Sequence, residues 1–289
     1  TAVAMKDILT RTVKKVPTLR GKTVINLFYE PSTRTKFSFN LAAKRLSADV
    51  MSISKSSSSI AKGESLLDTA KTMEVMGADV VVIRHSAPGA AKFLAENISA
   101  SVLNAGDGAH AHPTQALLDI YSIKEKLGQV AGLKVLIVGD IAHSRVARSN
   151  IWGLNKLGAE VAVAGPQTLI PREIEKMGVK VYSDLDQALE NVDVVNILRI
   201  QMERQESGLF PSIREYREIY GMNAERLERI GKKAMIMHPG PMNRGIEIES
   251  SVADSSQSVI TEQVKNGVAI RMALLYLLAG REIDNENLN

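Results

Sequence analysis

Short apolar runs alternate with longer amphipathic stretches along the chain, a pattern typical of α/β proteins with mostly parallel sheets. The apolar runs predict strands over residues 23–28, 50–53, 79–83, 101–104, 134–138, 160–164, 180–182, 193–198 and 234–237. The amphipathic stretches predict helices over residues 34–46, 65–76, 89–96, 114–127, 145–157, 171–177, 185–191 and 262–278. A long polar connection follows residue 198, and a polar loop spans residues 250–258.

A glycine-flanked segment, residues 128–132, separates two series of these elements. We therefore predict two domains, over residues 1–127 and 128–261, each a mostly parallel sheet flanked by helices. The C-terminal helix, within residues 262–289, carries a broad apolar face that must pack against another element. We expect it to pack back on the first domain and complete it. The chain opens on Thr1, inside a helix-like stretch, so we also expect a short natural N-terminal segment to be missing.

Composition narrows the class of protein. The chain has 289 residues, 45% hydrophobic and 24% charged, which suits about two globular domains of ~100–150 residues. No apolar run approaches the ~18–20 residues of a membrane span. The chain has no cysteine, which excludes disulfides, thiolate metal ligands and cysteine nucleophiles. We expect a cytoplasmic protein with no membrane partner, no metal and no cofactor.

The formal net charge is +4, but the basic residues are dispersed and aromatic residues make up only 4%. Nucleic-acid binders usually concentrate basic residues in a stripe beside stacking aromatics, so we expect no nucleic-acid partner. A mild basic excess also suits small anionic substrates drawn into a positive cleft.

The first chemical motif follows the first predicted strand and reads Glu30-Pro-Ser-Thr-Arg-Thr-Lys36. Three hydroxyl groups, an arginine and the unbonded N–H groups of a helix start favour a phosphate site. An ordinary Ser/Thr helix cap is the alternative. The chain has no G-x-x-x-x-G-K-[ST] loop, and Val138-Gly-Asp140 lacks the spacing of a dinucleotide site, which argues against an NTPase and a dehydrogenase.

The second motif, His112-Pro-Thr-Gln115, opens a predicted helix. A histidine at a helix start tends to stay neutral because the helix dipole opposes its protonation, and its N–H is then able to stabilise charge on a carbonyl oxygen. A packing role for His112 is the alternative. A metal pair with His110 is unconvincing because no third ligand lies at suitable spacing.

The third motif, His238-Pro-Gly-Pro-Met-Asn-Arg244, follows a predicted strand. Two prolines stiffen the backbone and remove N–H donors, so the carbonyl groups of Pro239 and Gly240 are candidate acceptors for an amine. A plain turn at the end of a strand is the alternative.

Together the three motifs resemble the transcarbamoylase family, and the match spans essentially the whole chain. Lys62-Gly-Glu-Ser65 also resembles the mobile lysine loop of its aspartate-specific branch. His238-Pro-Gly-Pro241 points to the same branch, since ornithine-specific members carry cysteines in the second and third motifs. The resemblance implies transfer of the carbamoyl group from carbamoyl phosphate to L-aspartate in pyrimidine biosynthesis. Transfer to another amino acid, such as ornithine, and a non-catalytic anion-binding protein are the alternatives.

The resemblance also implies roles for individual residues. The carbamoyl-phosphate site would comprise Ser32, Thr33, Arg34, Thr35, Arg84, His112, Gln115, Pro239 and Gly240. Of these, Thr35, Arg84 and His112 would polarise the carbonyl oxygen. The aspartate site would comprise Lys62, Arg145, Arg199 and Gln201.

Within the family, the loop over residues 54–64 reaches into a neighbouring subunit. Ser58 and Lys62 would then complete the active site of a neighbour, and the working unit would be a homotrimer. The trimer could join a larger assembly with regulatory or dihydroorotase chains. Without the resemblance, this loop is an ordinary solvated surface loop.

Overall fold

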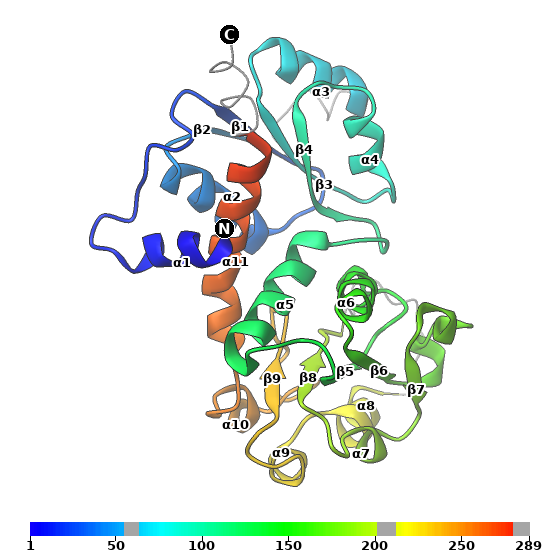
Figure 1. Cartoon of the computed structure of the whole chain (residues 1–289). Coiled ribbons are helices and arrows are strands. Elements are labelled where there is room, and N and C mark those ends of the chain that lie inside the picture. The colour runs from blue at the N-terminus through cyan, green and yellow to red at the C-terminus, as the bar shows by residue number, and fades with distance from the viewer. Residues whose placement is uncertain (55–63, 201–211, 280–289) are drawn as a thin grey trace. The chain divides into compact units, whose positions relative to one another are not determined.

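The computed structural model describes residues 1–54, 64–200 and 212–279 (Figure 1). The chain forms two compact units. The first comprises Thr1–Thr114 and Lys265–Asn289, and the second comprises Gln115–Val264. Each unit holds one parallel sheet with helices packed on it.

The sheet of the first unit has four parallel strands in the order β2-β1-β3-β4. The strands are β1 (Thr23–Phe28), β2 (Asp49–Ser54), β3 (Val80–His85) and β4 (Ser101–Asp107). The helices of the same unit are α1 (Ala2–Thr10), α2 (Thr33–Arg45), α3 (Leu66–Val75) and α4 (Ala90–Ala95).

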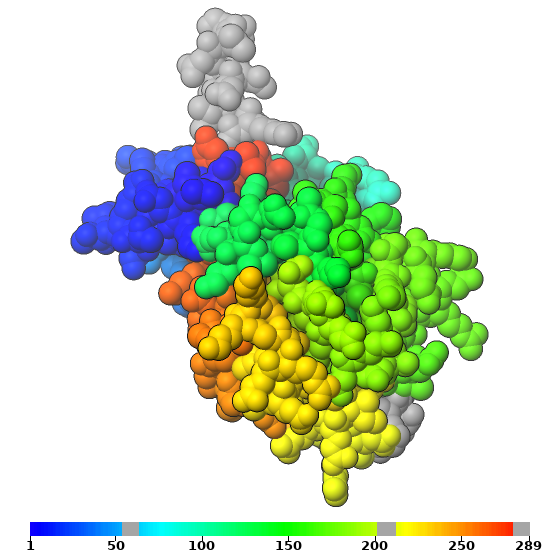
Figure 2. Space-filling model, turned by 60° about the horizontal axis from the view of Figure 1, so that its bottom comes forward, coloured from blue at the N-terminus to red at the C-terminus, as the bar shows by residue number. Residues whose placement is uncertain are grey.

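The C-terminal helix, α11 (Ile260–Ala279), packs on the first unit as the sequence predicted. Its buried residues Val268, Met272 and Leu275 belong to one hydrophobic cluster with Met5 of α1 and Phe39 of α2. The space-filling view shows the blue N-terminal segment beside the red end of this helix (Figure 2). The last part of the chain therefore completes the core of the first unit.

The sheet of the second unit has five parallel strands in the order β7-β6-β5-β8-β9. The strands are β5 (Lys134–Val138), β6 (Glu160–Ala164), β7 (Lys180–Tyr182), β8 (Val194–Ile197) and β9 (Met235–Met237). The α-helices are α5 (Pro113–Leu127), α6 (Arg145–Lys156), α7 (Leu185–Ala188), α8 (Ile213–Tyr220), α9 (Ala224–Arg229) and α10 (Ser250–Ala253).

The strands β5, β8 and β9 of this second sheet are buried, which explains why they read as continuous apolar runs. On β5, Ile137 packs into one hydrophobic cluster, whereas its neighbours Leu136 and Val138 pack into another on the opposite face. Successive side chains of a strand point to opposite faces, so a sheet with two covered faces needs apolar residues at every position.

Three sequence predictions for the second unit were wrong in detail. In place of the predicted helix over 171–177, the chain forms the short 3-10 helix η4 (Ile174–Met177), and another 3-10 helix, η3 (Gln167–Leu169), precedes this range. The predicted helix over 185–191 ends at Ala188, and Asn191 has a positive φ of 57° that no helix continues through. The predicted polar loop over 250–258 begins with the short helix α10.

The polar connection after residue 198 also contains two helices, α8 and α9, that the hydrophobic pattern did not predict. Only Tyr216 and Tyr220 of α8 are buried, so the helix shows too few apolar positions for its period to stand out. A capping signal was present: the Ser212 hydroxyl accepts a hydrogen bond from the backbone N–H of Glu215, as in a Ser-x-x-Glu helix start.

In the part of the chain that the structure describes, no helix is both long and apolar enough to span a membrane.

Candidate active site

The first three predicted site segments lie at one edge of the first sheet. The Ser32–Thr35 segment follows β1, Arg84 is the second-last residue of β3, and His112 lies just beyond β4. These three strands are neighbours and run parallel, so their carboxyl ends meet at the same edge. Ligands of open α/β sheets bind outside this edge, which makes it the candidate site of the first unit.

The start of α2 lacks a side-chain cap. Ser32 is the N-cap residue, but its side chain makes no capping hydrogen bond. The backbone N–H groups of the first helical turn have no partners within the helix, and the helix dipole makes this end positive. Thr35 is buried in that turn, whereas Thr33 and Arg34 are exposed. Ser32 therefore occupies the N-cap position without forming the side-chain hydrogen bond of an ordinary Ser/Thr cap.

Arg84 is held in place from two sides. Its Nη1 donates to the carbonyl oxygen of Ala105 at 3.2 Å, and its Nε lies 3.5 Å from Oε2 of Glu30. The Arg84 and Glu30 side chains are 13% and 18% exposed, so the pair is largely shielded from water. A guanidinium fixed in this way presents its charge at the edge of the sheet in a single orientation.

The loop before His112 is organised by a buried carboxylate. Asp107 is 2% exposed and accepts hydrogen bonds from the Gly89 N–H at 2.8 Å, from Asn104 Nδ2 at 3.0 Å and from the Ala111 N–H at 3.1 Å. Burial alone would raise the pKa of Asp107, but hydrogen bonds from Asn104, Gly89 and His110 outweigh it and lower the pKa. The loop therefore holds an ionised carboxylate that fixes the approach to His112.

His112 itself is 6% exposed and directly precedes α5. The side chain of the nearby His110 contacts Asp107, with 3.1 Å between His110 Nδ1 and Asp107 Oδ2. Within residues 1–54, 64–200 and 212–279, no group of three or more His, Cys, Asp or Glu side chains is placed to hold a metal ion.

Four further site residues follow strands at the carboxyl edge of the second sheet. Arg145 opens α6 after β5, Arg199 follows β8, and Pro239 and Gly240 follow β9. These strands are adjacent and parallel in the sheet. Arg145 is only 4% exposed, and Arg199 is partly buried. Two largely desolvated guanidinium groups at one edge suit a ligand with carboxylates.

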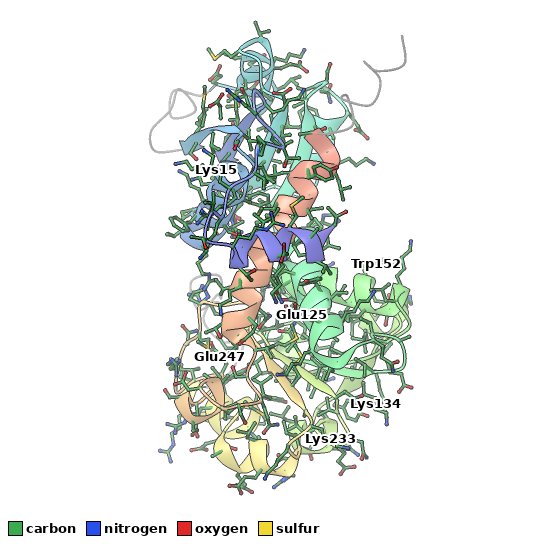
Figure 3. All side chains as sticks on the ribbon, turned by 60° about the vertical axis from the view of Figure 1, so that its left-hand side comes forward. Lys15, Glu125, Lys134, Trp152, Lys233 and Glu247 are labelled. Carbon is green, nitrogen blue, oxygen red and sulfur yellow. The ribbon has the colours of Figure 1, made fainter. Side chains whose placement is uncertain are left out.

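The turn after β9 is held by His238. The Nδ1 of His238 accepts from the Gly240 N–H at 2.8 Å, so the ring proton lies on Nε2, which is 3.2 Å from Oε1 of Glu247. Both side chains are fully buried (Glu247 is labelled in Figure 3). Gly240 has a φ of +62°, a left-handed conformation that glycine adopts without strain. The turn is thus a fixed structure, with Pro239 and Gly240 partly exposed at its surface.

Gln115 lies in the first turn of α5 and is 8% exposed. Its Nε2 donates to Oδ1 of Asp119 at 2.9 Å, and Asp119 is completely buried. Burial raises the pKa of Asp119 to about 6, although hydrogen bonds from Asn150, Gln263, Gln115 and Asn196 oppose the rise. The side chain of Gln115 is therefore anchored on its amino side.

The sequence reasoning missed three supporting carboxylates: Asp107, Asp119 and Glu247. For Asp119 a signal existed, because Gln115 and Asp119 are polar residues four apart on a helix whose neighbouring positions Ala116, Leu118 and Ile120 are buried. Polar residues on the apolar face of a helix need partners, which marks them as a network. Asp107 and Glu247 lie in loop-like sequence and gave no such signal.

Ser58, Lys62 and Gln201, also predicted for the site, lie outside the described residues. His143, near Arg145, contacts a buried carboxylate, with 2.9 Å between its Nδ1 and Oδ1 of Asp140.

Two family models match consecutive parts of the chain. A family model described as "Aspartate/ornithine carbamoyltransferase, carbamoyl-P binding domain" matches residues 1–125. A second, described as "Aspartate/ornithine carbamoyltransferase, Asp/Orn binding domain", matches residues 131–278.

Individual relatives agree with these models. The aspartate carbamoyltransferase catalytic subunit of Halothermothrix orenii is 81% identical over 288 residues, covering 100% of this chain and 92% of the relative. The catalytic subunit of M. Jannaschii aspartate transcarbamoylase superposes with a TM-score of 0.83 at 38% identity, covering 99% of this chain and 92% of the other. Aspartate transcarbamoylase from Trypanosoma cruzi, in complex with N-(phosphonacetyl)-L-aspartic acid, gives a TM-score of 0.85 at 31% identity, covering 95% and 88%.

Proposed function

The chain belongs to the aspartate/ornithine carbamoyltransferase family, and from this premise we propose how its own residues carry out the family reaction. It transfers the carbamoyl group of carbamoyl phosphate to the amine of L-aspartate, which gives N-carbamoyl-L-aspartate and phosphate in pyrimidine biosynthesis. The observation that carries this conclusion is 81% identity, along the whole chain, with a catalytic subunit of the aspartate enzyme.

The choice of aspartate over ornithine also has physical support. Arg145 and Arg199 both follow strands at one edge of the second sheet. Two guanidinium groups suit the two carboxylates of aspartate, whereas the second would repel the terminal ammonium of ornithine. The full sequence has no cysteine, the residue that the ornithine-specific pattern requires.

Carbamoyl phosphate binds, in this proposal, at the start of α2. Ser32, Thr33, Arg34 and Thr35 surround the phosphate with hydroxyl groups, backbone N–H groups and one guanidinium. The uncapped helix start supports this role, since its donors and the helix dipole both favour an anion. Arg84 bridges the phosphate and the carbonyl oxygen from the neighbouring strand.

The chemical step is an attack of the aspartate amine on the carbonyl carbon. A C–N bond forms, the bond from carbon to the phosphate oxygen breaks, and the leaving phosphate takes the proton that the amine loses. Negative charge builds on the carbonyl oxygen, where Thr35, Arg84 and His112 donate hydrogen bonds. Donors fixed before the reaction stabilise such charge without reorganising, and each is worth roughly 3–4 kcal/mol in comparable sites. The reaction needs no metal and no cofactor.

The other end of the carbamoyl group is an NH₂ donor, and it requires acceptors. We assign these to the side-chain oxygen of Gln115 and the backbone carbonyl groups of Pro239 and Gly240. The rigid turn held by His238 supports this assignment. On the aspartate side, Arg145 and Arg199 bind the carboxylates, with Gln201 and Lys62 assisting.

For the assembly we propose a homotrimer in which Ser58 and Lys62 act in the site of a neighbouring subunit. Regulatory or dihydroorotase chains are candidate further partners, and the cytoplasm is the proposed location. We further propose that residues 1–127 with 262–289 form the carbamoyl-phosphate domain and residues 128–261 the aspartate domain. The proposed boundary at residues 127 and 128 lies between the two matching family models, which cover residues 1–125 and 131–278.

The test is product formation by the purified chain with carbamoyl phosphate and either aspartate or ornithine. We expect carbamoyl-aspartate and phosphate in equal amounts, and no citrulline. Citrulline formed at a comparable rate would overturn the aspartate assignment. Carbamoyl phosphate bound without turnover would favour an anion-binding protein.

A further inference from the structure

The core of the second unit contains a carboxylate that the proposed reaction does not use directly. Asp119, on α5, has no exposed surface. Its Oδ1 accepts from Gln115 Nε2 at 2.9 Å and from Gln263 Nε2 at 2.8 Å, and its Oδ2 accepts from Asn150 Nδ2 at 2.8 Å. A buried carboxylate surrounded by amides is costly compared with a packed apolar core, so a role in setting geometry is worth testing.

The chemistry of this cluster fixes which way each amide faces. An ionised carboxylate only accepts hydrogen bonds, whereas a side-chain amide has a donating NH₂ side and an accepting oxygen side. Each amide that touches Asp119 must therefore turn its NH₂ group towards the carboxylate. For Gln115, this leaves the Oε1 oxygen directed away from Asp119 and available as an acceptor.

The same requirement sets the orientation of Gln263, which contacts the turn after β9. Because Gln263 points its NH₂ group at Asp119, its Oε1 is placed to accept the backbone N–H of His238, at 3.0 Å. The ring of His238 then accepts the Gly240 N–H at 2.8 Å and contacts Glu247 at 3.2 Å. A continuous chain of hydrogen bonds therefore joins Asp119 to the turn that contains Pro239 and Gly240.

We propose that Asp119 is a positioning residue for carbamoyl transfer: through Gln115 and Gln263 it orients the acceptors that bind the carbamoyl NH₂ group. This inference rests on the proposed function, since the assignment of these acceptors comes from there. Gln115 and the Pro239–Gly240 turn come from distant parts of the sequence, and the hydrogen bonds of one buried carboxylate hold both.

A double-mutant cycle tests the proposal. Asp119→Ala, Gln115→Ala and the double variant are compared with the wild type for kcat at saturating carbamoyl phosphate and aspartate. Far-UV circular dichroism and thermal unfolding check that each variant is folded. We expect each single change to lower kcat about tenfold, the value of roughly one hydrogen bond. If Asp119 acts through Gln115, the two effects should not multiply. The kcat of the double variant should then be at least about threefold higher than the kcat expected from multiplying the two single effects.

The experiment also includes a control variant and a substitute for Asp119→Ala. The control is Ser122→Ala, one turn further along α5, which removes a buried hydroxyl that donates to the Leu118 carbonyl oxygen. We expect its effect on kcat to multiply with that of Gln115→Ala. If Asp119→Ala does not fold, Asp119→Asn takes its place in the cycle, because it keeps the shape and removes one of the two acceptor atoms. The KM for aspartate should change less than about threefold in the Asp119 variants, since the carboxylate-binding arginines are untouched.

The outcomes separate this inference from the proposed function. Coupling of threefold or more between Asp119 and Gln115 supports the positioning role. Smaller coupling, or a wild-type kcat in the Asp119 variant, overturns it while leaving an active wild-type enzyme. A wild-type chain that forms no carbamoyl-aspartate overturns the proposed function and the inference with it.

Discussion

The carboxylate of Asp107, at the end of β4, accepts the backbone N–H of Gly89, before α4, at 2.8 Å. This bond ties the loop that leads to His112 to the loop that follows β3 and Arg84. Gly108, next to Asp107, lies so close to this second loop that a Cβ atom there would approach the Ser86 carbonyl oxygen to 2.8 Å. The two loops are therefore held together by a hydrogen bond to the Asp107 carboxylate and by close packing.

We predict that Asp107→Ala lowers the free energy of unfolding by about 2–3 kcal/mol near pH 7, because buried N–H donors lose their acceptor. The pKa of Asp107 is lowered in the folded chain, so its ionised form is the stabilising one. The difference between wild type and variant should be complete above the ordinary value of 3.8 and should shrink as the pH falls below it. Urea unfolding at several pH values measures this, and a difference that grows towards low pH would contradict the assignment.

We predict that His112→Ala lowers kcat about 100-fold and changes either KM much less, since the proposed hydrogen bond strengthens as charge builds on the carbonyl oxygen. Steady-state kinetics with both substrates measure the split. His110→Ala is the matched control, because that side chain is 61% exposed and lies only two residues away. Unchanged turnover in the His112 variant would remove this residue from the chemical step.

We predict that Arg199→Ala raises the KM for aspartate about tenfold or more and leaves the KM for carbamoyl phosphate nearly unchanged, because the proposed contact with a carboxylate is lost. Arg172→Ala, at an exposed arginine of the same unit, serves as the control and should change neither constant. Equal increases in both KM values would show that Arg199 does not distinguish the two substrates.

Asp119 gives a pH dependence of opposite sign to that of Asp107. Its pKa is raised from 3.8 to about 6 in the folded chain, so folding favours the protonated form. Its contribution to stability is complete below about pH 4 and is lost as the pH rises through about 6. We predict that the stability of the wild type relative to Asp119→Asn falls by about 2 kcal/mol between pH 4 and pH 7. A relative stability that rises over this range would contradict the raised pKa.

The strands β1, β5 and β6 lie over the predicted residues because strands packed on both faces need unbroken apolar runs. The strand β7 also lies over the predicted residues, although it is only partly buried. The helices α8 and α9 were missed for the converse reason. They bury few apolar side chains, so their period does not show, and only their Ser212 and Asn223 caps mark them.

The candidate site was proposed from three motifs, because motifs are local in sequence, but its supporting groups could not be predicted. Asp119 reaches Gln263 across 144 positions of the chain, and His238 reaches Glu247 across nine. Such partners meet only when the strands and helices that carry them are packed. The sequence alone therefore suggests which groups touch substrate, and the fold shows what holds those groups still.

A crystal structure of the chain with N-(phosphonacetyl)-L-aspartic acid, the compound bound by the Trypanosoma cruzi enzyme, tests the site most directly. We predict that the phosphonate lies within about 3 Å of the backbone N–H groups at the start of α2 and that the aspartate carboxylates contact Arg145 and Arg199. A phosphonate bound away from α2, or carboxylates that touch neither arginine, would contradict the account.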